Sequence, residues 1–188
     1  FRGGMVIAGN VSTPLSEFEG EVSAEDTMKF GEFQSKEYLM ATFGAHFVEV
    51  GVHVGTGETR LRRMLAVCDS GRILNPVTAR SQVIGGMVMG VGAALSEELA
   101  TDTGRGFFVN HDLAGYEVAV HADIPDQQVV FLDTLDAVST PLKAKGVGEL
   151  GLCGVAAAIA NAAYNATGIR VRDYPITMNR MIDRLPAI

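Results

Sequence analysis

The sequence predicts an α+β fold, with mixed sheets packed against helices, and three patterns carry this prediction. Residues 41–54 are rich in β-branched and aromatic side chains, and a Gly-Thr-Gly-Glu turn at 55–58 separates them from a second such segment at 60–69. This pattern predicts a β-hairpin. Apolar residues recur at three- and four-residue steps over 76–99, which predicts an amphipathic helix. The uncharged, alanine-rich segment 155–163 predicts a buried helix.

The remaining elements follow from local signals along the chain. Asn75 followed by Pro76 marks the start of the long helix, because asparagine caps helix N-termini and proline is favoured at the first position. A loop is expected at 102–106, and a final amphipathic helix at 177–185. Short strands are expected at 5–8, 115–121, 127–132 and 169–171. With 47% hydrophobic and 20% charged residues among 188, the chain is globular and large enough for a core.

Glycines in the long helix need an explanation, because each costs about 1 kcal/mol relative to alanine in a helix interior. Close packing of another helix or strand against the glycine face is one explanation. A bulky ligand near the first turns is the other, since the amide of Gln82 can both donate and accept hydrogen bonds there. The two explanations are compatible. The glycines are Gly85, Gly86, Gly90 and Gly92.

The segment 145–151, Lys-Gly-Val-Gly-Glu-Leu-Gly, is the strongest candidate for a site of chemistry. Its glycines allow unusual backbone conformations and close approach of main-chain N–H groups to a ligand. The carboxylate of Glu149 precedes an apolar helix, and apolar surroundings raise a carboxyl pKa toward the range of a general base. The helix start would also offer N–H donors to an anion. Alternatively, Glu149 is simply a residue favoured by the helix dipole.

The same segment matches Gly-x-Gly-x-x-Gly, the dinucleotide-binding fingerprint, but its context does not fit. That fingerprint follows a strand directly and has an acidic residue about twenty positions later. Here the strand candidate 129–132 is separated from Gly146 by a polar segment that contains proline, and no acid lies between Glu149 and Asp173. A Rossmann oxidoreductase would require a strand that runs into Gly146.

Charge, cysteines and histidines exclude several other functions. A net charge of −7 and a pI near 5.0, without runs of Lys or Arg, argue against nucleic acid or an anionic membrane as partner. No segment is expected to approach the length of a membrane span, because charges or glycines interrupt every apolar run. Cys68 and Cys153 are expected to be buried thiols. His46 and His53 should point to opposite faces of one strand, and no histidine has metal-type spacing.

Four motifs occur in this order along the chain, at residues 44–50, 67–76, 82–92 and 145–149. Together they resemble the C-terminal portion of the molybdenum-binding large subunit of the xanthine dehydrogenase and aldehyde oxidoreductase family. The segment from 160 to 177 looks most like the bacterial aldehyde oxidoreductase branch. The resemblance runs from about residue 41 to the end. It assigns residues 41–188 to the C-terminal part of a molybdenum-cofactor-binding domain, and residues 1–40 to an irregular segment that continues from an upstream part.

The resemblance implies a specific chemistry, the oxidation of aldehydes or hydroxylation of N-heterocycles with water as the oxygen source. Glu149 takes the place of the general base that receives the proton of the molybdenum-bound hydroxyl. Gln82 takes the place of a glutamine that contacts the pterin, and Lys145, Gly146, Val147 and Gly148 that of a turn beside the metal. No side chain need ligate molybdenum, because the pterin sulfurs hold it. Molybdopterin cytosine dinucleotide is the expected form.

The resemblance also implies partners. Iron–sulfur clusters and FAD are expected on partner subunits or domains, and a small aldehyde or heteroaromatic molecule as substrate. The family subunit is several times longer than this chain, so the chain, which begins at Phe1, is expected to be a fragment that is inactive alone and self-associates through exposed apolar surface. The alternative is a non-catalytic docking fragment that cannot bind cofactor alone.

Overall fold

The computed structural model describes residues 3–17, 23, 25 and 37–186, which belong to two compact units, Phe1–Glu32 and Phe33–Ile188. In the first unit, strand β1 (Met5–Ala8) pairs antiparallel with β2 (Val11–Pro14), and a short 3-10 helix, η1 (Leu15–Glu17), follows. The strand predicted at 5–8 is confirmed. Strand β2 was not predicted from the sequence. Most of the predicted irregular segment beyond residue 17 lies outside the described residues.

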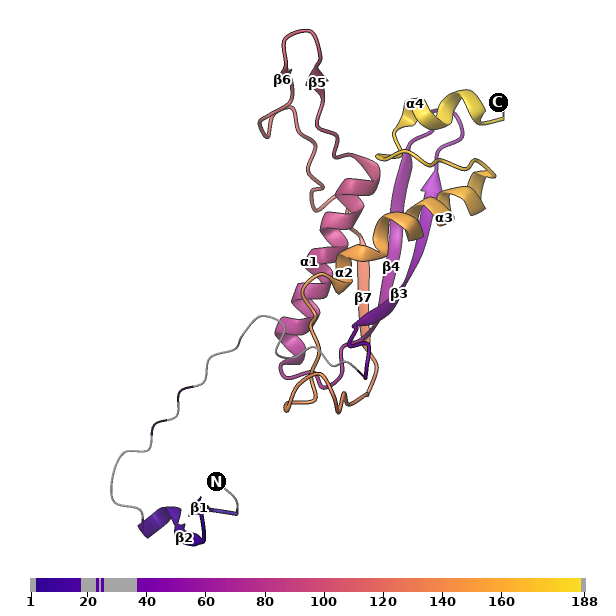
Figure 1. The fold of residues 1–188 in the computed structure, drawn as a ribbon. Coiled ribbons are helices and arrows are strands. Elements are labelled where there is room, and N and C mark those ends of the chain that lie inside the picture. The colour runs from indigo at the N-terminus through magenta and orange to yellow at the C-terminus, as the bar shows by residue number, and fades with distance from the viewer. Residues whose placement is uncertain (1–2, 18–22, 24, 26–36, 187–188) are drawn as a thin grey trace. The chain divides into compact units, whose positions relative to one another are not determined.

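The second unit contains a three-stranded sheet of order β3-β4-β7 (Figure 1). Strands β3 (Phe43–Val52) and β4 (Thr59–Asp69) form the predicted antiparallel hairpin, with Phe43 opposite Asp69. Strand β7 (Asp126–Phe131), also predicted, lies parallel to β4. Parallel neighbours need a crossover connection, and this connection contains helix α1 (Pro76–Leu95). The sheet therefore contains one antiparallel and one parallel strand pairing. Together with the helices, this mixed sheet confirms the predicted α+β class.

Helix α1 begins as predicted but ends earlier. The side chain of Asn75 accepts hydrogen bonds from the N–H groups of Val77 and Thr78, at 3.1 and 3.2 Å. The sequence pattern extends to residue 99, but the N–H groups of Ser96 and Glu97 both bond to the carbonyl of Gly92, and the chain leaves the helix there. An apolar residue at the next helical step is therefore no proof that the helix continues.

The glycine face of α1 is a packing surface. A β-carbon at Gly86 would lie 2.9 Å from the backbone of Gly151 and Leu152, and one at Gly90 would lie 2.5 Å from the side chain of Val155. The predicted close packing of a helix is confirmed at these two glycines. It does not hold for Gly85, where a β-carbon would meet nothing within 4 Å, or for Gly92, where it would first meet the side chain of Glu97. The packed elements are α2 (Leu150–Cys153) and α3 (Val155–Thr167).

The core of the second unit lies between the sheet and its helices, which Figure 1 shows on one face of the strands. Alternate residues of β4 point inward, as the two-residue period of a strand requires, and meet one stripe of α1 and one stripe of α3. Helix α3 is buried on one stripe only, whereas the sequence predicted a buried helix. The inward residues of the core are Met64, Ala66, Cys68, Val83, Met87, Val91, Val155, Ile159 and Ala163.

Three sequence predictions differ from the structure. Residues 115–121 form bends and loop, because the Asp112 carbonyl already accepts the N–H groups of Gly115 and Tyr116 in a local turn. Residues 169–171 are not assigned to a strand. The final helix is short: α4 (Met178–Met181) continues as a 3-10 helix, η2 (Ile182–Arg184). The predicted loop at 102–106 connects a small hairpin, β5 (Thr101–Asp102) with β6 (Phe107–Phe108), which projects from the body of the unit (Figure 1).

Residues Leu150–Thr167 are long and apolar enough to cross a membrane by length and composition, with mean hydropathy 1.2 over 18 residues. The expectation that no segment has this length was wrong, because averaging over the window absorbs the glycines that were read as interruptions. One such segment is weak evidence for a membrane span, since core helices of soluble proteins pass the same test. Its α3 part contacts α1 and β3.

Candidate active site

The turn that carries Glu149 is fixed through every second carbonyl group. The hydroxyl of Thr42 donates to the carbonyl of Gly146 at 3.1 Å, and the amide of Gln82 donates to the carbonyl of Gly148 at 3.2 Å. One residue beyond Glu149, the carbonyl of Leu150 lies 3.2 Å from Nε2 of His46. These three side chains come from the approach to β3, from α1 and from β3 itself, so the turn is held from two sides.

Lys145 anchors the start of the turn to the end of β4. Its N–H donates to the carbonyl of Ser70 at 2.8 Å, and its ammonium lies 2.9 Å from Oδ1 of Asp69. Both side chains of this ion pair are only 11% exposed. The ammonium also lies 5.3 Å from the centre of the Phe43 ring, within cation–π range. The ammonium of Lys145 holds the pKa of Asp69 below its usual value, against the opposing effect of burial.

Glu149 occupies the position before helix α2, with no capping bond from its side chain. It is exposed and lines a cleft of about 710 Å³ together with Phe43, His46 and the turn itself. Within the part of the chain that the structure describes, its carboxylate makes no hydrogen bond or ion pair. The sequence predicted a carboxylate enclosed by apolar residues, and this expectation was wrong for the chain by itself, because α2 presents residue 149 to the open cleft.

The three glycines of the turn are explained by different features of the structure. None of Gly146, Gly148 and Gly151 has positive φ, so the predicted need for an unusual backbone conformation was wrong. A β-carbon at Gly151 would clash with the backbone carbonyl of Val83 in α1, so packing requires a glycine there. At Gly146 and Gly148 a β-carbon would meet nothing within 4 Å. The chain therefore leaves open space beside the part of the turn that faces the clefts. Its own packing does not require glycine at positions 146 and 148.

The turn separates the main cleft from two smaller hollows. One of about 330 Å³ is lined by Gln82, Lys145 and Val147, among others. Another of about 380 Å³ lies beside Lys145 and Gly146, next to Thr42. The structure thus brings all the residues singled out by the sequence, from Gln82 in α1 to Glu149, to one place.

Two expectations about reactive side chains were wrong. Cys68 is buried as predicted, but Cys153 is exposed and lines the main cleft, because the short helix α2 turns it outward. His53 lies beyond the end of β3, and a bulge at 49 and 50 breaks the alternation along the strand, so the two-face argument for His46 and His53 does not apply. Among the described residues, no group of three His, Cys, Asp or Glu side chains could hold a metal ion.

His46 should make the stability of the chain depend on pH. Burial lowers its pKa below the usual 6.5, and the hydrogen bond to the Leu150 carbonyl offsets part of this shift. The unfolded chain therefore takes up a proton first as the pH falls, so the free energy of unfolding should decrease from pH 6.5 down to the folded pKa. We expect His46→Gln to reduce this decrease in urea unfolding curves recorded between about pH 7.5 and about pH 5. His53→Gln, at an exposed position, is the matched control and should leave it in place.

Several site residues were not singled out from the sequence. Thr42 and Phe43 lie beside motif residues without any chemical pattern of their own. His46 was considered only as a metal ligand. Asp69 could have been noticed in the sequence, because it is an acidic residue at the end of an apolar strand segment. Its partner Lys145, however, lies 76 positions later in the chain. No local pattern reports a contact over that separation.

The α+β unit thus has a cleft lined by two open glycines and the Glu149 carboxylate, with the Gln82 amide in the hollow on the other side of the turn. Such an arrangement is typical of small-molecule or cofactor-binding proteins. The sequence profile described as "Molybdopterin cofactor-binding domain" matches residues 7–125. This chain belongs to that family. The resemblance to the molybdenum-binding subunits of xanthine dehydrogenases and aldehyde oxidoreductases is thereby confirmed.

The chain is also similar to named members of this group of proteins. The aldehyde oxidoreductase molybdenum-binding subunit PaoC of Escherichia coli K12 is 65% identical over 190 residues, covering 100% of this chain and 26% of that protein. The xanthine dehydrogenase molybdenum-binding subunit of Escherichia coli O157:H7 is 35% identical, covering 87% of this chain and 21% of that protein. The aldehyde oxidoreductase structure from Desulfovibrio desulfuricans ATCC 27774 matches with a TM-score of 0.70 and 34% identity, over 77% of this chain and 16% of that one. The chain therefore spans about a quarter of its curated relatives or less.

Proposed function

We propose that this chain is part of the large subunit of a molybdenum hydroxylase, whose intact form oxidises aldehydes, or hydroxylates N-heterocycles, with water as the oxygen source. The observation that carries the proposal is the exposed carboxylate of Glu149, presented to a 710 Å³ cleft by a turn that is fixed at alternate carbonyls. Ligand clefts of several hundred Å³ are typical of small-molecule and cofactor sites. Membership of the cofactor-binding family supports the same conclusion.

The residues of the site fit a molybdenum–pterin cofactor, for which we propose the cytosine dinucleotide form. Gly146 and Gly148 leave open space where any β-carbon would project. The amide of Gln82 uses one N–H on the carbonyl of Gly148 and keeps a second N–H and an oxygen. An amide with both a donor and an acceptor suits the edge of a pterin ring. When bound, such a cofactor supplies a water-derived oxygen and takes up the two electrons removed from the substrate.

Each residue then has a defined role. A carboxylate oxygen of Glu149 accepts the proton of the attacking oxygen, as a general base. The backbone from Lys145 to Gly148, with Val147 between the clefts, provides the wall against which the cofactor lies. For Lys145 we propose contact through its backbone carbonyl, because its ammonium is paired with Asp69 and its N–H donates to Ser70. Iron–sulfur and FAD subunits would receive the electrons, and the substrate would be a small aldehyde or heteroaromatic molecule.

One observation favours the alternative of a docking fragment. Phe47 pairs with Leu65, and Val130 with Val67, on the sheet face opposite the inward residues of β4. Phe47 and Val130 are 58% and 47% exposed. Apolar side chains on an uncovered sheet face are typical of protein contact surfaces. Self-association of the isolated chain therefore remains a prediction, and this face rather than the helices is where we expect it.

The proposal is tested by molybdenum and pterin analysis of the complete subunit and of its Gly148→Val variant. We expect the parent to contain both and to oxidise an aldehyde. The variant should keep its circular dichroism spectrum and lose most of its cofactor, about tenfold or more, because a β-branched side chain fills the space beside the turn.

Gly104→Val, in the exposed β5–β6 loop, is the control and should load cofactor normally. A complete subunit that purifies without molybdenum or pterin and does not turn over aldehyde would contradict the proposed function. A Gly148→Val variant that folds and loads like the parent would show that the cofactor does not lie against this turn.

A further inference from the structure

The turn that bears Glu149 cannot define its own conformation. Gly146 and Gly148 lack side chains that would restrict the backbone, so the position of Glu149 depends on the contacts that hold the turn. Thr42 and Gln82 hold it in the middle, at the carbonyls of Gly146 and Gly148, and further contacts hold its two ends. The far end is held at Leu150 by His46. The near end is held at Lys145, whose ammonium contacts Asp69, the last residue of β4, and whose N–H donates to the carbonyl of Ser70. The bridge between Gly71 and Ala144 lies directly beside these contacts.

The near-end anchor is centred on Asp69. Oδ1 of Asp69 receives the ammonium of Lys145 at 2.9 Å, the hydroxyl of Thr134 at 3.0 Å and the N–H of Gly71 at 3.2 Å. Asp69 is the last residue of β4 and belongs to the sheet, so its position is fixed by the core. Lys145, by contrast, is part of a loop that runs without strand or helix from residue 132 to residue 149.

We propose that Asp69 is a positioning residue, which sets the place of the Glu149 carboxylate through its ion pair with Lys145. The proposal rests on the proposed function, since it assigns Asp69 to the same site. With both partners 11% exposed, neither charge is well solvated when the other is removed. Loss of the pair therefore moves Lys145, and the glycine turn transmits the movement to Glu149.

The variant Asp69→Asn isolates the charge. An asparagine oxygen still accepts hydrogen bonds from Thr134 and Gly71, and it can accept one from the ammonium of Lys145. The variant therefore removes only the negative charge that pairs with Lys145 and leaves a weaker, neutral acceptor. In the complete subunit we expect kcat for an aldehyde to fall between about tenfold and a hundredfold, the range expected when a catalytic group is misplaced by about 1 Å. KM and the content of molybdenum and pterin should change less than about threefold, because binding does not require the base.

Two further measurements separate positioning from a general structural effect. Hydrogen exchange, followed by mass spectrometry in the cofactor-free subunit, should increase in the peptide covering 144–150 and not in β3 or β4. Lys145→Met breaks the same contact from the other side, and the double variant should be no worse than the poorer single one, because both act through one interaction.

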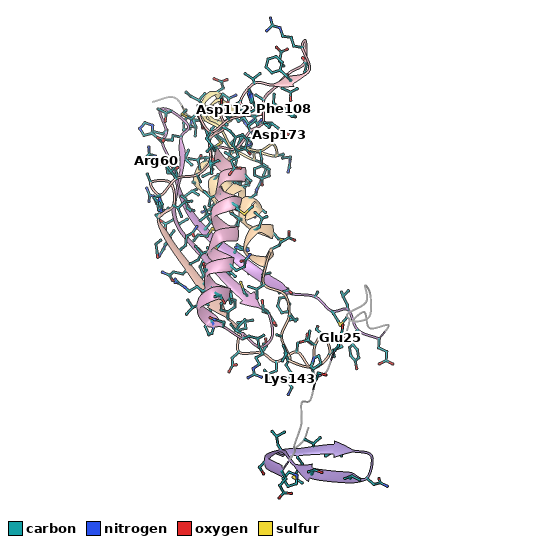
Figure 2. The ribbon with its side chains drawn as sticks, turned by 90° about the vertical axis from the view of Figure 1, so that its left-hand side faces the viewer. Glu25, Arg60, Phe108, Asp112, Lys143 and Asp173 are labelled. Atoms are coloured by element: carbon teal, nitrogen blue, oxygen red, sulfur yellow. The ribbon has the colours of Figure 1, made fainter. Side chains whose placement is uncertain are left out.

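The matched control is Glu58→Gln. Glu58 forms an ion pair with Arg60 at 2.8 Å in the same hairpin, but the two side chains are 43% and 77% exposed, against 11% for Asp69 and Lys145. Arg60 also lies at the end of the unit away from Lys143 and its loop (Figure 2). An exposed pair contributes little, so Glu58→Gln should leave kcat, cofactor content and exchange at 144–150 unchanged.

The inference falls if Asp69→Asn leaves kcat within about twofold and exchange at 144–150 unchanged, or if the losses in the double variant multiply. If Asp69→Asn does not fold, Lys145→Met is measured instead. Failure of both variants to fold would show a role in stability and overturn positioning. Full activity of a Glu149→Gln variant would defeat the proposed function, whereas the exchange data and the double variant would still decide whether the pair fixes the turn.

Discussion

Replacing Glu149 with glutamine in the complete subunit is expected to reduce aldehyde turnover by at least about a hundredfold, the usual effect of removing a general base. The amide has the shape of the carboxylate but cannot accept a proton. Glu149 makes no side-chain bond recorded among the described residues, and it does not cap α2, so the substitution breaks no contact that supports the fold. Molybdenum and pterin content should therefore stay near the parental level.

The control variant for this experiment is Glu97→Gln. Glu97 accepts a hydrogen bond from Tyr116 in a different part of the unit and lines none of the clefts around the turn. Its variant should retain full turnover. A Glu149→Gln subunit that loads cofactor and keeps more than about a tenth of the parental rate would show that another group takes the proton.

The sequence predicted well those strands and helices in which the spacing of apolar residues shows that one face is buried. The hairpin of β3 and β4 and the first five turns of α1 follow directly from alternation, from the Asn75 cap and from spacing of apolar residues. The segments at 115–121 and 169–171 were mistaken for strands because β-branched residues also occur in extended loops. Strand pairing depends on a neighbour elsewhere in the chain. Instead, Gly115 and Tyr116 bond to the Asp112 carbonyl in a local turn, and the N–H of Ile169 bonds to the hydroxyl of Thr167.

The sequence predicted the chemically active part of the candidate site, but it did not predict most of the side chains that hold this part in place. The glycine turn and Glu149 form one continuous segment, which a sequence pattern can show. The contacts of this turn come from four side chains that lie between 66 and 104 positions away along the chain, those of Thr42, His46, Asp69 and Gln82. Such contacts are fixed by the packing of α1 and β3 around the turn. They become visible only when the fold is known, although Gln82 was identified through the family resemblance.

The clearest stability prediction concerns Gly151, which the sequence placed with the functional glycines. A β-carbon at Gly151 would clash with the carbonyl of Val83, a backbone group inside α1 that cannot rotate away. Gly151→Ala should therefore force α2 from α1 and lower the free energy of unfolding by about 3 kcal/mol, the upper part of the usual range for overpacking. Urea unfolding of this chain, followed by circular dichroism, measures the effect.

Gly146→Ala is the matched control, with the same added methyl group in the same turn. Its β-carbon meets nothing within 4 Å and its φ is not positive, so the free energy of unfolding should stay within about 1 kcal/mol of the parent. Equal stabilities for the two variants would mean that α2 does not pack on Val83 as described. A loss confined to Gly151→Ala would separate the glycine that the fold needs from the two, at 146 and 148, whose space we assign to the cofactor.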